Sequence, residues 1–325
     1  MNKNKGNKNR TLSGPMLGAL LVMSGAKRIG LAKPMLKRAI KKMFFSKAIK
    51  QSFGSYEAQA ADVFVTTFAK SGTNWMMQIA QQIAFYGDAE FDHIHDVAAW
   101  PDAPSSGPIP LSDMSARDVS PTGLRIIKTH LDANCVPYDE RATYLTVIRD
   151  PKEVTVSAYY FLLGIFDALD YVSPEDWFDL FMESEVLGRA WATHTDTFWR
   201  WRDRPNVLVF TYDELKENPE ECVKKVAKQM GVALNSAQFS KVIERISFEH
   251  MRANEAQFSP PRSPFVKEKD ATVMLRSGKI GGSSEMLSLA QQAEIDKLAL
   301  AALKQIGSDF PYETLFNVVN ADLNK

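Results

Sequence analysis

The stretch "DVFVTTFAKSGTNW" (residues 62–75) decides the fold class of this chain. Its apolar Val-Phe-Val run is typical of a buried strand, and the small-residue loop that follows contains Lys70 and Gly72. Loop N–H groups ahead of a helix attract anions, so this loop is expected to bind a phosphate, and Thr73 and Asn74 add donors that can cap the helix. In the phosphate loop of nucleotide triphosphatases the lysine follows the last glycine, whereas here it precedes the only glycine. The alternative is a plain helix start with a solvated lysine.

From residue 60 onward, short apolar runs alternate with stretches of helical spacing, which indicates an α/β domain with a central parallel sheet. Strands are expected at 62–67, 125–129, 143–148 and 206–211. Helices are expected at 74–86, 151–163, 174–182, 189–202, 219–230, 236–246 and 287–306. The stretches 98–113 and 254–270 are expected to be surface loops of the kind that cover a binding site.

The composition is that of an ordinary globular protein, with 45% apolar and 24% charged residues among 325. The two cysteines, Cys135 and Cys222, lie far apart without metal-ligand spacing, which favours a reducing compartment and a cytoplasmic location. Residues 1–50 hold 13 of the 39 Lys and Arg and no Asp or Glu, so residues 51–325 carry 26 basic and 39 acidic residues, a net charge of −13. That charge argues against nucleic acid as a partner of the aromatic cluster at 198–202.

The basic segment 1–55 is expected to be an N-terminal extension, partly disordered or an amphipathic helix, ahead of a main domain at 56–325. Three interpretations are open for its apolar residues. They form a signal-peptide core near 16–23, a helix in peripheral contact with an anionic membrane through residues 1–50, or a helix that packs on the domain with its lysines in solvent. The apolar stretch is too short and too interrupted to span a bilayer.

A second strand runs into a helix at "YLTVIRDPKEVTVSAYYF" (144–161). Arg149 comes at the expected end of the strand, and Ser157 follows about two helical turns later. Both residues can face a second anion if Arg149 folds back over the helix. The alternative is that Arg149 pairs with Asp150 or Asp167 and that Ser157 is a small packing residue.

A third strand ends in "IIKTHL" (126–131), where Lys128 and His130 point to the same face because they are two residues apart. Parallel sheets place their active sites at the carboxyl ends of their strands. The unperturbed pKa of histidine suits proton abstraction at neutral pH, so His130 is a candidate base. The alternative is a hydrogen-bonded structural histidine.

Together these motifs resemble the cytosolic-type sulfotransferases. "KSGTNW", "KTH", "RDPKEVTVSAYYF", "FTYDELKENP" and "RSGKIGG" occur in the order and approximate spacing of that family, from about residue 60 to 310. Members transfer a sulfuryl group from 3′-phosphoadenosine 5′-phosphosulfate to a hydroxyl or amine. The resemblance implies one α/β domain with a P-loop-like fold and a central parallel sheet of about five strands.

The resemblance also implies the roles of individual residues. His130 is implied as the catalytic base, Lys70 as the group that stabilises the leaving phosphate oxygen, and Lys128 as an assistant at the sulfuryl group. The residues implied for the co-substrate are Lys70, Ser71, Gly72, Thr73 and Asn74 at the 5′-phosphosulfate, Trp75, Tyr212, Ser247 and Phe248 at the adenine, and Arg149, Ser157, Arg276, Ser277 and Gly278 at the 3′-phosphate.

The C-terminal motif departs from the family pattern of Arg-Lys-Gly followed by Gly-Asp-Trp-Lys. Residues 276–284 read "RSGKIGGSS", so Ser277 stands in place of the lysine and Lys279 is the nearest cation that can replace it. The dimerisation pattern found in many members is not matched either. The sequence therefore leaves the oligomeric state open.

No metal is expected, because a sulfuryl group carries less charge than a transferring phosphoryl group and no acidic ligand follows the loop motif. The pair His93 and His95 in "DHIHD" is the alternative metal site, without an evident third ligand. A small-molecule acceptor is expected, with an apolar pocket formed by Trp100, Phe161, Phe166 and Phe265. The rival functions are sulfation of a carbohydrate or other large acceptor, and non-catalytic nucleotide binding, against which the retained Lys70 and His130 argue.

Overall fold

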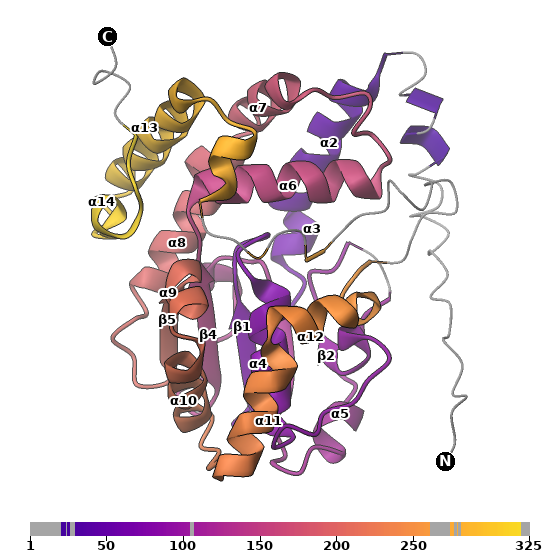
Figure 1. Ribbon diagram of the computed structural model, residues 1–325, viewed down its shortest axis with the longest axis vertical. Coiled ribbons are helices and arrows are strands. Elements are labelled where there is room, and N and C mark those ends of the chain that lie inside the picture. Colours follow the sequence, from indigo (N-terminus) through magenta and orange to yellow (C-terminus); the bar gives the residue numbers. More distant parts are fainter. Residues whose placement is uncertain are drawn as a thin grey trace.

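A central sheet of five parallel strands organises the chain (Figure 1). The computed structural model describes residues 21–23, 25–26, 30–104, 107–260, 274–275, 278 and 281–319. The strands are β1 (Asp62–Thr66), β2 (Ala98–Ala99), β3 (Arg125–Thr129), β4 (Thr143–Ile148) and β5 (Val207–Thr211), in the spatial order β2-β3-β1-β4-β5. The predicted single α/β domain with a parallel sheet is confirmed.

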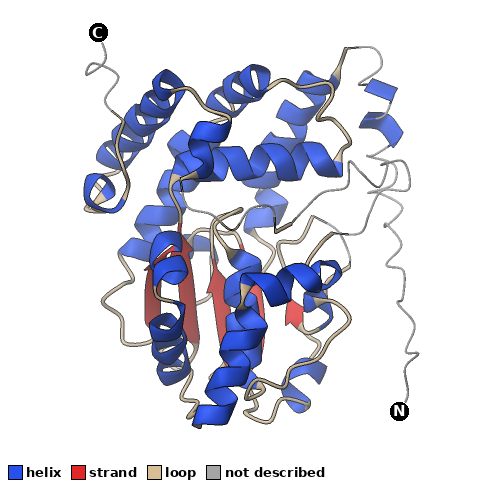
Figure 2. Cartoon of the chain, viewed as in Figure 1, coloured by secondary structure: helices blue, strands red, loops and turns tan. Residues whose placement is uncertain are grey.

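Both faces of the sheet are covered, so its central strand is apolar without alternation. All five residues of β1 are buried. Val63 and Val65 belong to the apolar cluster that includes α4 (Thr73–Ala84), α10 (Pro219–Gln229) and α11 (Ser236–Ile246). On the opposite face Phe64 stacks on Tyr144 with ring centroids 4.9 Å apart. Figure 2 shows these helices in front of the strands.

A second group of helices lies above the carboxyl ends of the strands and forms the upper half of the molecule in Figure 1. Its apolar cluster is centred on the fully buried Trp177 and Trp191. The members are α2 (Ala32–Phe45), α6 (Pro151–Ile165), α7 (Pro174–Glu183), the π-helix η3 (Val186–Trp191), α8 (Ala192–Trp199), α13 (Leu289–Gln305) and α14 (Tyr312–Leu315). The space between this group and the strand ends is where a site can form.

Short elements complete the described chain. They are α3 (Lys47–Lys50), η1 (Ile94–Asp96), α5 (Ser115–Asp118), η2 (Ala133–Cys135), α9 (Tyr212–Glu217), α12 (Phe248–Ala253), η4 (Glu255–Gln257) and η6 (Gly282–Glu285). None of the described helices is both long enough and apolar enough to cross a bilayer.

Two sequence predictions of local structure were wrong. The stretch 98–113 is not entirely loop, because Ala98 and Ala99 pair with Ile126 and Ile127 as the edge strand β2. The single helix expected at 189–202 is divided into η3 and α8 and ends at Trp199. The two alanines of β2 are too few to show the alternation typical of a strand. The change from π-helix to α-helix between η3 and α8 leaves the spacing of apolar residues almost unaltered, so the sequence does not show it either.

Helix α2 packs on the domain through its apolar face. Leu36 and Ile40 are fully buried in the upper cluster, whereas its lysines lie outside. Two of those lysines pair with α7, Lys33 with Asp176 and Lys37 with Glu183. For α2, this arrangement is that of the interpretation in which the helix packs on the domain and keeps its lysines in solvent.

Replacement of Leu36 by alanine is expected to lower the free energy of unfolding by about 2–5 kcal/mol, because it leaves a cavity in the upper cluster. Lys41→Ala on the exposed side of the same helix is the matched control and is expected to change the stability by less than about 0.5 kcal/mol. Chemical denaturation measures both. Equal stability of the two variants would show that α2 is not part of the folded core.

Candidate active site

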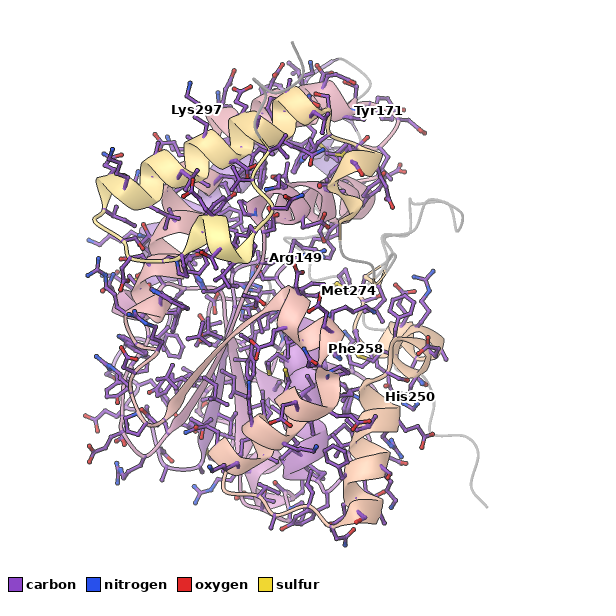
Figure 3. The ribbon with its side chains drawn as sticks, turned by 60° about the vertical axis from the view of Figure 1, so that its left-hand side comes forward. Arg149, Tyr171, His250, Phe258, Met274 and Lys297 are labelled. Atoms are coloured by element: carbon purple, nitrogen blue, oxygen red, sulfur yellow. The ribbon has the colours of Figure 1, made fainter. Side chains whose placement is uncertain are left out.

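A cavity of about 940 Å³ lies between the carboxyl ends of the strands and the helices above them. Arg149 and Met274 lie in this central region in Figure 3. The cavity brings together most residues that the sequence singled out, although they come from six separate segments. They are Lys70, Gly72, Thr73, Asn74, Trp75, Lys128, His130, Arg149, Ser157, Tyr212, Ser247, Phe248 and Gly278. Ser71 lies buried in the loop beneath, and Arg276 and Ser277 lie outside the described residues.

The loop after β1 has a backbone conformation that needs a glycine. Lys70 and Gly72 have φ angles of +68° and +91°. A Cβ on Gly72 would lie 2.9 Å from a ring carbon of Tyr212, so a side chain has no room there. The hydroxyls of Thr67 and Thr73 lie 2.5 Å apart across the loop. This conformation brings the chain close to Tyr212 and directs the start of α4 at the cavity.

Helix α4 begins without a side-chain cap among the described residues. The prediction that Thr73 or Asn74 caps it was wrong, because the Thr73 hydroxyl contacts Thr67 and the Asn74 amide donates to the Phe258 carbonyl at 3.1 Å. The Ser71 hydroxyl is fully buried and has no partner in the described part of the chain. An uncapped helix start beside an unpartnered buried hydroxyl suits an anion.

Arg149 follows β4 and binds back over the loop. Its guanidinium donates to the Lys70 carbonyl at 2.9 Å, pairs with Glu153 at 3.3 Å and lies 4.3 Å from the Tyr212 ring centroid. The alternative partners Asp150 and Asp167 were therefore wrong, and Glu153, one helical turn further on, was missed. The Nε atom of Arg149 is buried without a partner among the described residues, which leaves a donor for another anion.

Lys70 is a cation without a carboxylate partner in the described structure. Its ammonium lies 3.8 Å from the Phe161 ring centroid and 3.7 Å from the Met274 sulfur. Burial, followed by the nearby charges of Arg149 and Lys128, lowers the pKa of Lys70 to about 7. A bound anion would supply the missing opposite charge and restore the cation.

His130 is held in one orientation by its neighbours. Its Nδ1 lies 2.8 Å from the Thr67 carbonyl, its backbone N–H donates to Asp102 at 2.9 Å, and its ring meets the Trp100 ring edge-on. Because a carbonyl only accepts, Nδ1 carries the proton, and the Nε2 of the neutral ring is free to accept one. Burial and the charge of Lys128 hold the pKa of His130 well below its usual value, so the ring is neutral at pH 7.

Lys128 reaches the same cavity from the strand that carries His130. Its side chain is buried and its ammonium lies 3.4 Å from the Trp100 ring centroid. Burial lowers the pKa of Lys128 to about 7, and the carboxyl of Asp102 opposes that fall. Trp100 was expected in a pocket, whereas Asp102 was missed because no local pattern relates it to a strand 28 residues away.

Aromatic rings form another wall of the cavity. Trp75 meets Tyr212 edge-on at 6.0 Å and donates its indole N–H to the Ile246 carbonyl. Gly278 lies against Phe248 so closely that a Cβ there would come within 2.6 Å of the ring. The Ser247 hydroxyl caps α12 by accepting from the His250 N–H at 3.1 Å. These rings make this wall of the cavity aromatic.

The far wall is apolar and comes in part from α2 and α3, which sequence reasoning missed. Phe44 stacks on Phe68, with ring centroids 5.4 Å apart, just before the loop that holds Lys70. Phe161 and Phe166 line the cavity as expected, whereas Phe265 lies outside the described residues. The remaining apolar residues of this wall are Met43, Phe45, Ile49, Leu131 and Ile165.

His93 and His95 also border the cavity. Nδ1 of His93 accepts from the His95 N–H at 3.1 Å, and Nε2 of His93 lies 3.0 Å from the Ser259 carbonyl. In the described ranges no three His, Cys, Asp or Glu side chains converge as metal ligands would.

Fold and site together define an α/β protein with a cavity at the carboxyl ends of its strands, in which Lys70, Lys128 and Arg149 adjoin a histidine. The chain belongs to the sulfotransferase family, since the family model described as "Sulfotransferase domain" matches residues 60–307. It is 26% identical to human sulfotransferase 1C2 over 253 residues, which cover 75% of this chain and 83% of the relative. It is 28% identical to dog sulfotransferase 1A1 over 268 residues, covering 78% and 86%.

Solved structures share the fold at lower identity. A retinol dehydratase in complex with retinol and PAP superposes with a TM-score of 0.64 at 19% identity, covering 85% of this chain and 96% of the other. Mouse sulfotransferase SULT7A1 in complex with PAP gives a TM-score of 0.54 at 22% identity, covering 78% and 89%. The predicted family and enzyme class are confirmed.

The loop geometry predicts a specific cost for Gly72→Ala. A left-handed alanine costs about 1–3 kcal/mol of stability, and the contact with Tyr212 adds to that cost. Gly231→Ala is the matched control, because Gly231 has a φ of +67° but open space around its Cα. Chemical denaturation should show the larger loss for Gly72→Ala, and Tyr212→Ala should reduce the excess. Equal losses of stability in the two glycine variants would contradict the inference that the Tyr212 ring leaves no room for a Cβ at Gly72.

Proposed function

We propose that this chain transfers a sulfuryl group from 3′-phosphoadenosine 5′-phosphosulfate to the hydroxyl of a small, mainly apolar acceptor. The observation that carries the proposal is the cavity in which unpaired cations adjoin a neutral histidine, His130, with its acceptor nitrogen free. Related proteins of the family have been solved with PAP, the nucleotide that remains after such a donor loses its sulfuryl group. The residues present fit this nucleotide.

The donor is proposed to lie along the strand ends. The loop Lys70–Thr73, with its buried Ser71 hydroxyl and the uncapped start of α4, would hold the 5′-phosphosulfate. Arg149 and Ser157 would hold the 3′-phosphate, with Arg276, Ser277 and Gly278 proposed to complete that clamp. The aromatic wall that includes Trp75, Tyr212 and Phe248 would take the adenine.

Because Glu153 already pairs with Arg149, the 3′-phosphate would share this guanidinium with a carboxylate. The free Nε of Arg149 is the donor left for the phosphate. Glu153 is itself fixed by the Ser283 N–H at 2.7 Å, so it aims the guanidinium and does not follow the ligand. Ser283, within the altered motif, thus supports the site through its backbone N–H.

Three residues would then carry the chemistry. His130 takes the acceptor proton at Nε2 while the acceptor oxygen attacks sulfur, and this general base contributes about 10²–10⁴-fold. Lys70 stabilises the charge that grows on the oxygen between phosphorus and sulfur, a contribution of about 10²–10³-fold. Lys128, on the other side of His130, faces the equatorial oxygens of the sulfuryl group. The low pKa of His130 keeps it ready to accept a proton at neutral pH.

The acceptor is proposed to be lipophilic because the wall beside His130 is built from rings and aliphatic side chains, among them Phe44, Phe161 and Phe166. A carbohydrate or another large polar acceptor would leave most of its hydroxyls unpaired against this wall. An amine remains possible chemically, since the same base removes its proton. Retinol and androsterone are bound by the retinol dehydratase of similar fold.

His130→Ala is expected to lower kcat by about 10²–10⁴-fold, with little change in PAP affinity, because the base acts on the acceptor only. His250→Ala is the matched control, since His250 is absent from the cavity lining and lies at the right edge of Figure 3. A radiolabelled sulfate-transfer assay over phenols, sterols and long-chain alcohols measures both. Native turnover by His130→Ala would contradict the role of His130 as the base. Absence of transfer by the native chain to every acceptor would contradict the proposed function.

PAP affinity is expected to fall above pH 7, by up to about tenfold per pH unit. The pKa of Lys70 is about 7, so the lysine loses its proton as the pH rises, and binding of the anion must first restore it. Calorimetric titration of PAP between pH 6 and 9 measures this dependence. Lys70→Arg, whose charge persists, should flatten it, whereas Lys128→Arg should retain most of it. The same slope in Lys70→Arg would contradict the assignment.

A further inference from the structure

The turn that follows β2 contacts Lys128, on β3, and His130, directly after β3. Trp100 packs edge-on against His130 and lies beneath the Lys128 ammonium. Asp102, two residues later, accepts the His130 backbone N–H. We propose that Asp102 is a positioning residue of the sulfuryl transfer, which fixes the backbone of His130 and keeps Lys128 charged. The inference rests on the proposed function.

Burial of the Asp102 carboxylate has a free-energy cost that its single hydrogen bond to His130 does not explain. It is 6% exposed, Oδ2 accepts from His130 at 2.9 Å, and Oδ1 is buried with no hydrogen-bond partner among the described residues. An asparagine oxygen would serve the His130 N–H equally well without burial of a charge. Burial raises the pKa of Asp102, and the His130 hydrogen bond and the charge of Lys128 oppose that rise. The ionised carboxylate of Asp102 and the ammonium of Lys128 therefore stabilise each other.

Lys128 needs such support, because its environment favours the neutral amine. The ammonium is buried on the Trp100 ring, and burial lowers its pKa while Asp102 raises it. The other titratable groups that line the cavity at the strand ends are Lys70 after β1, His130 and Asp132 after β3, Arg149 after β4, Glu153 in α6, His95 in η1 and His194 in α8. Glu153 is engaged by Arg149, and Oδ1 of Asp132 accepts from the Asn134 N–H at 3.1 Å. Among the described groups, Asp102 is the carboxyl whose charge acts on the pKa of Lys128.

For catalysis, Lys128 and His130, which are two residues apart at the end of β3, must therefore have different charge states. The neutral ring of His130 accepts the proton, while two residues earlier Lys128 must remain a cation to face a sulfuryl group whose oxygens gain charge. Burial alone moves both side chains toward their neutral forms. Asp102 acts selectively, because its charge favours the cation of Lys128 and its hydrogen bond goes to the His130 backbone, not to the ring.

The test compares Asp102→Asn with the native chain over pH 6–9. Asparagine keeps an oxygen for the His130 N–H and removes the charge, so the alkaline fall of kcat should move to lower pH by about one unit, with about a tenfold lower rate at pH 8. Placed in a Lys128→Arg background, where the cation cannot be lost, the same change should leave the profile unmoved. Asp102→Ser, which keeps an acceptor oxygen, repeats the comparison if the asparagine variant folds poorly.

A second measurement does not depend on activity. Titration of isotope-labelled lysine by NMR, with the Lys128 signal assigned by its loss in Lys128→Arg, should show a lower pKa for Lys128 in Asp102→Asn. An unchanged Lys128 titration, or an equal shift of the profile in the Lys128→Arg background, overturns the role of Asp102. Absence of sulfate transfer by the native chain overturns the proposed function instead, and the NMR titration still decides the link between Asp102 and Lys128.

Discussion

The central constraint on this molecule is the burial of positive charge at the carboxyl ends of three neighbouring strands. Lys70 follows β1, Lys128 lies on β3 and Arg149 follows β4. Lys70 has no carboxylate partner in the described structure, whereas the charge of Asp102 acts on Lys128. Buried cations are tolerated only where something lowers their charge or supplies an opposite one. Here the pKa values of both lysines fall to about 7, so partial loss of their protons at neutral pH relieves the repulsion between the cations.

The fold makes this arrangement possible because its strand order places β1 between β3 and β4. Residues that follow three strands therefore meet at one point, although they are up to 79 residues apart along the chain. Residues of both groups of helices line the cavity. The same desolvation that penalises the lysines keeps His130 neutral, so one physical cause prepares both the anion site and the base.

Much of this site was predictable because strand, loop and helix are contiguous in sequence. The stretches around Lys70, His130 and Arg149 each end an apolar run, and a parallel sheet brings such ends together. The sequence failed where a partner depends on tertiary packing. Asp102 reaches His130 from a two-residue strand whose register is set by Ile126 and Ile127, and no local pattern shows that.

Glu153 was missed for a different reason, since its pairing with Arg149 could have been predicted from the sequence. It stands four residues after Arg149 at the start of a helix, which is the spacing of an ion pair, and the i, i+4 rule favours it over Asp150. The predicted side-chain cap of α4 was wrong because Thr73 and Asn74 have other partners. Thr73 and Asn74 have the chemistry of capping residues, but their side chains are used elsewhere, and the helix end is left open toward the cavity. A local rule that is broken at one point of an otherwise consistent fold marks a site.

Helix α2 shows why a strongly basic segment belongs to this enzyme. Its inner face closes the upper cluster, and Phe44 stacks on Phe68 two residues before Lys70, so the helix also seals one side of the cavity. An acidic residue on that inner wall would pair with Lys70 or Lys128 and remove the unbalanced charge on which anion binding depends. The complete absence of Asp and Glu from residues 1–50 agrees with that requirement. The lysines on the outer face cost little, because they remain in water or pair with α7.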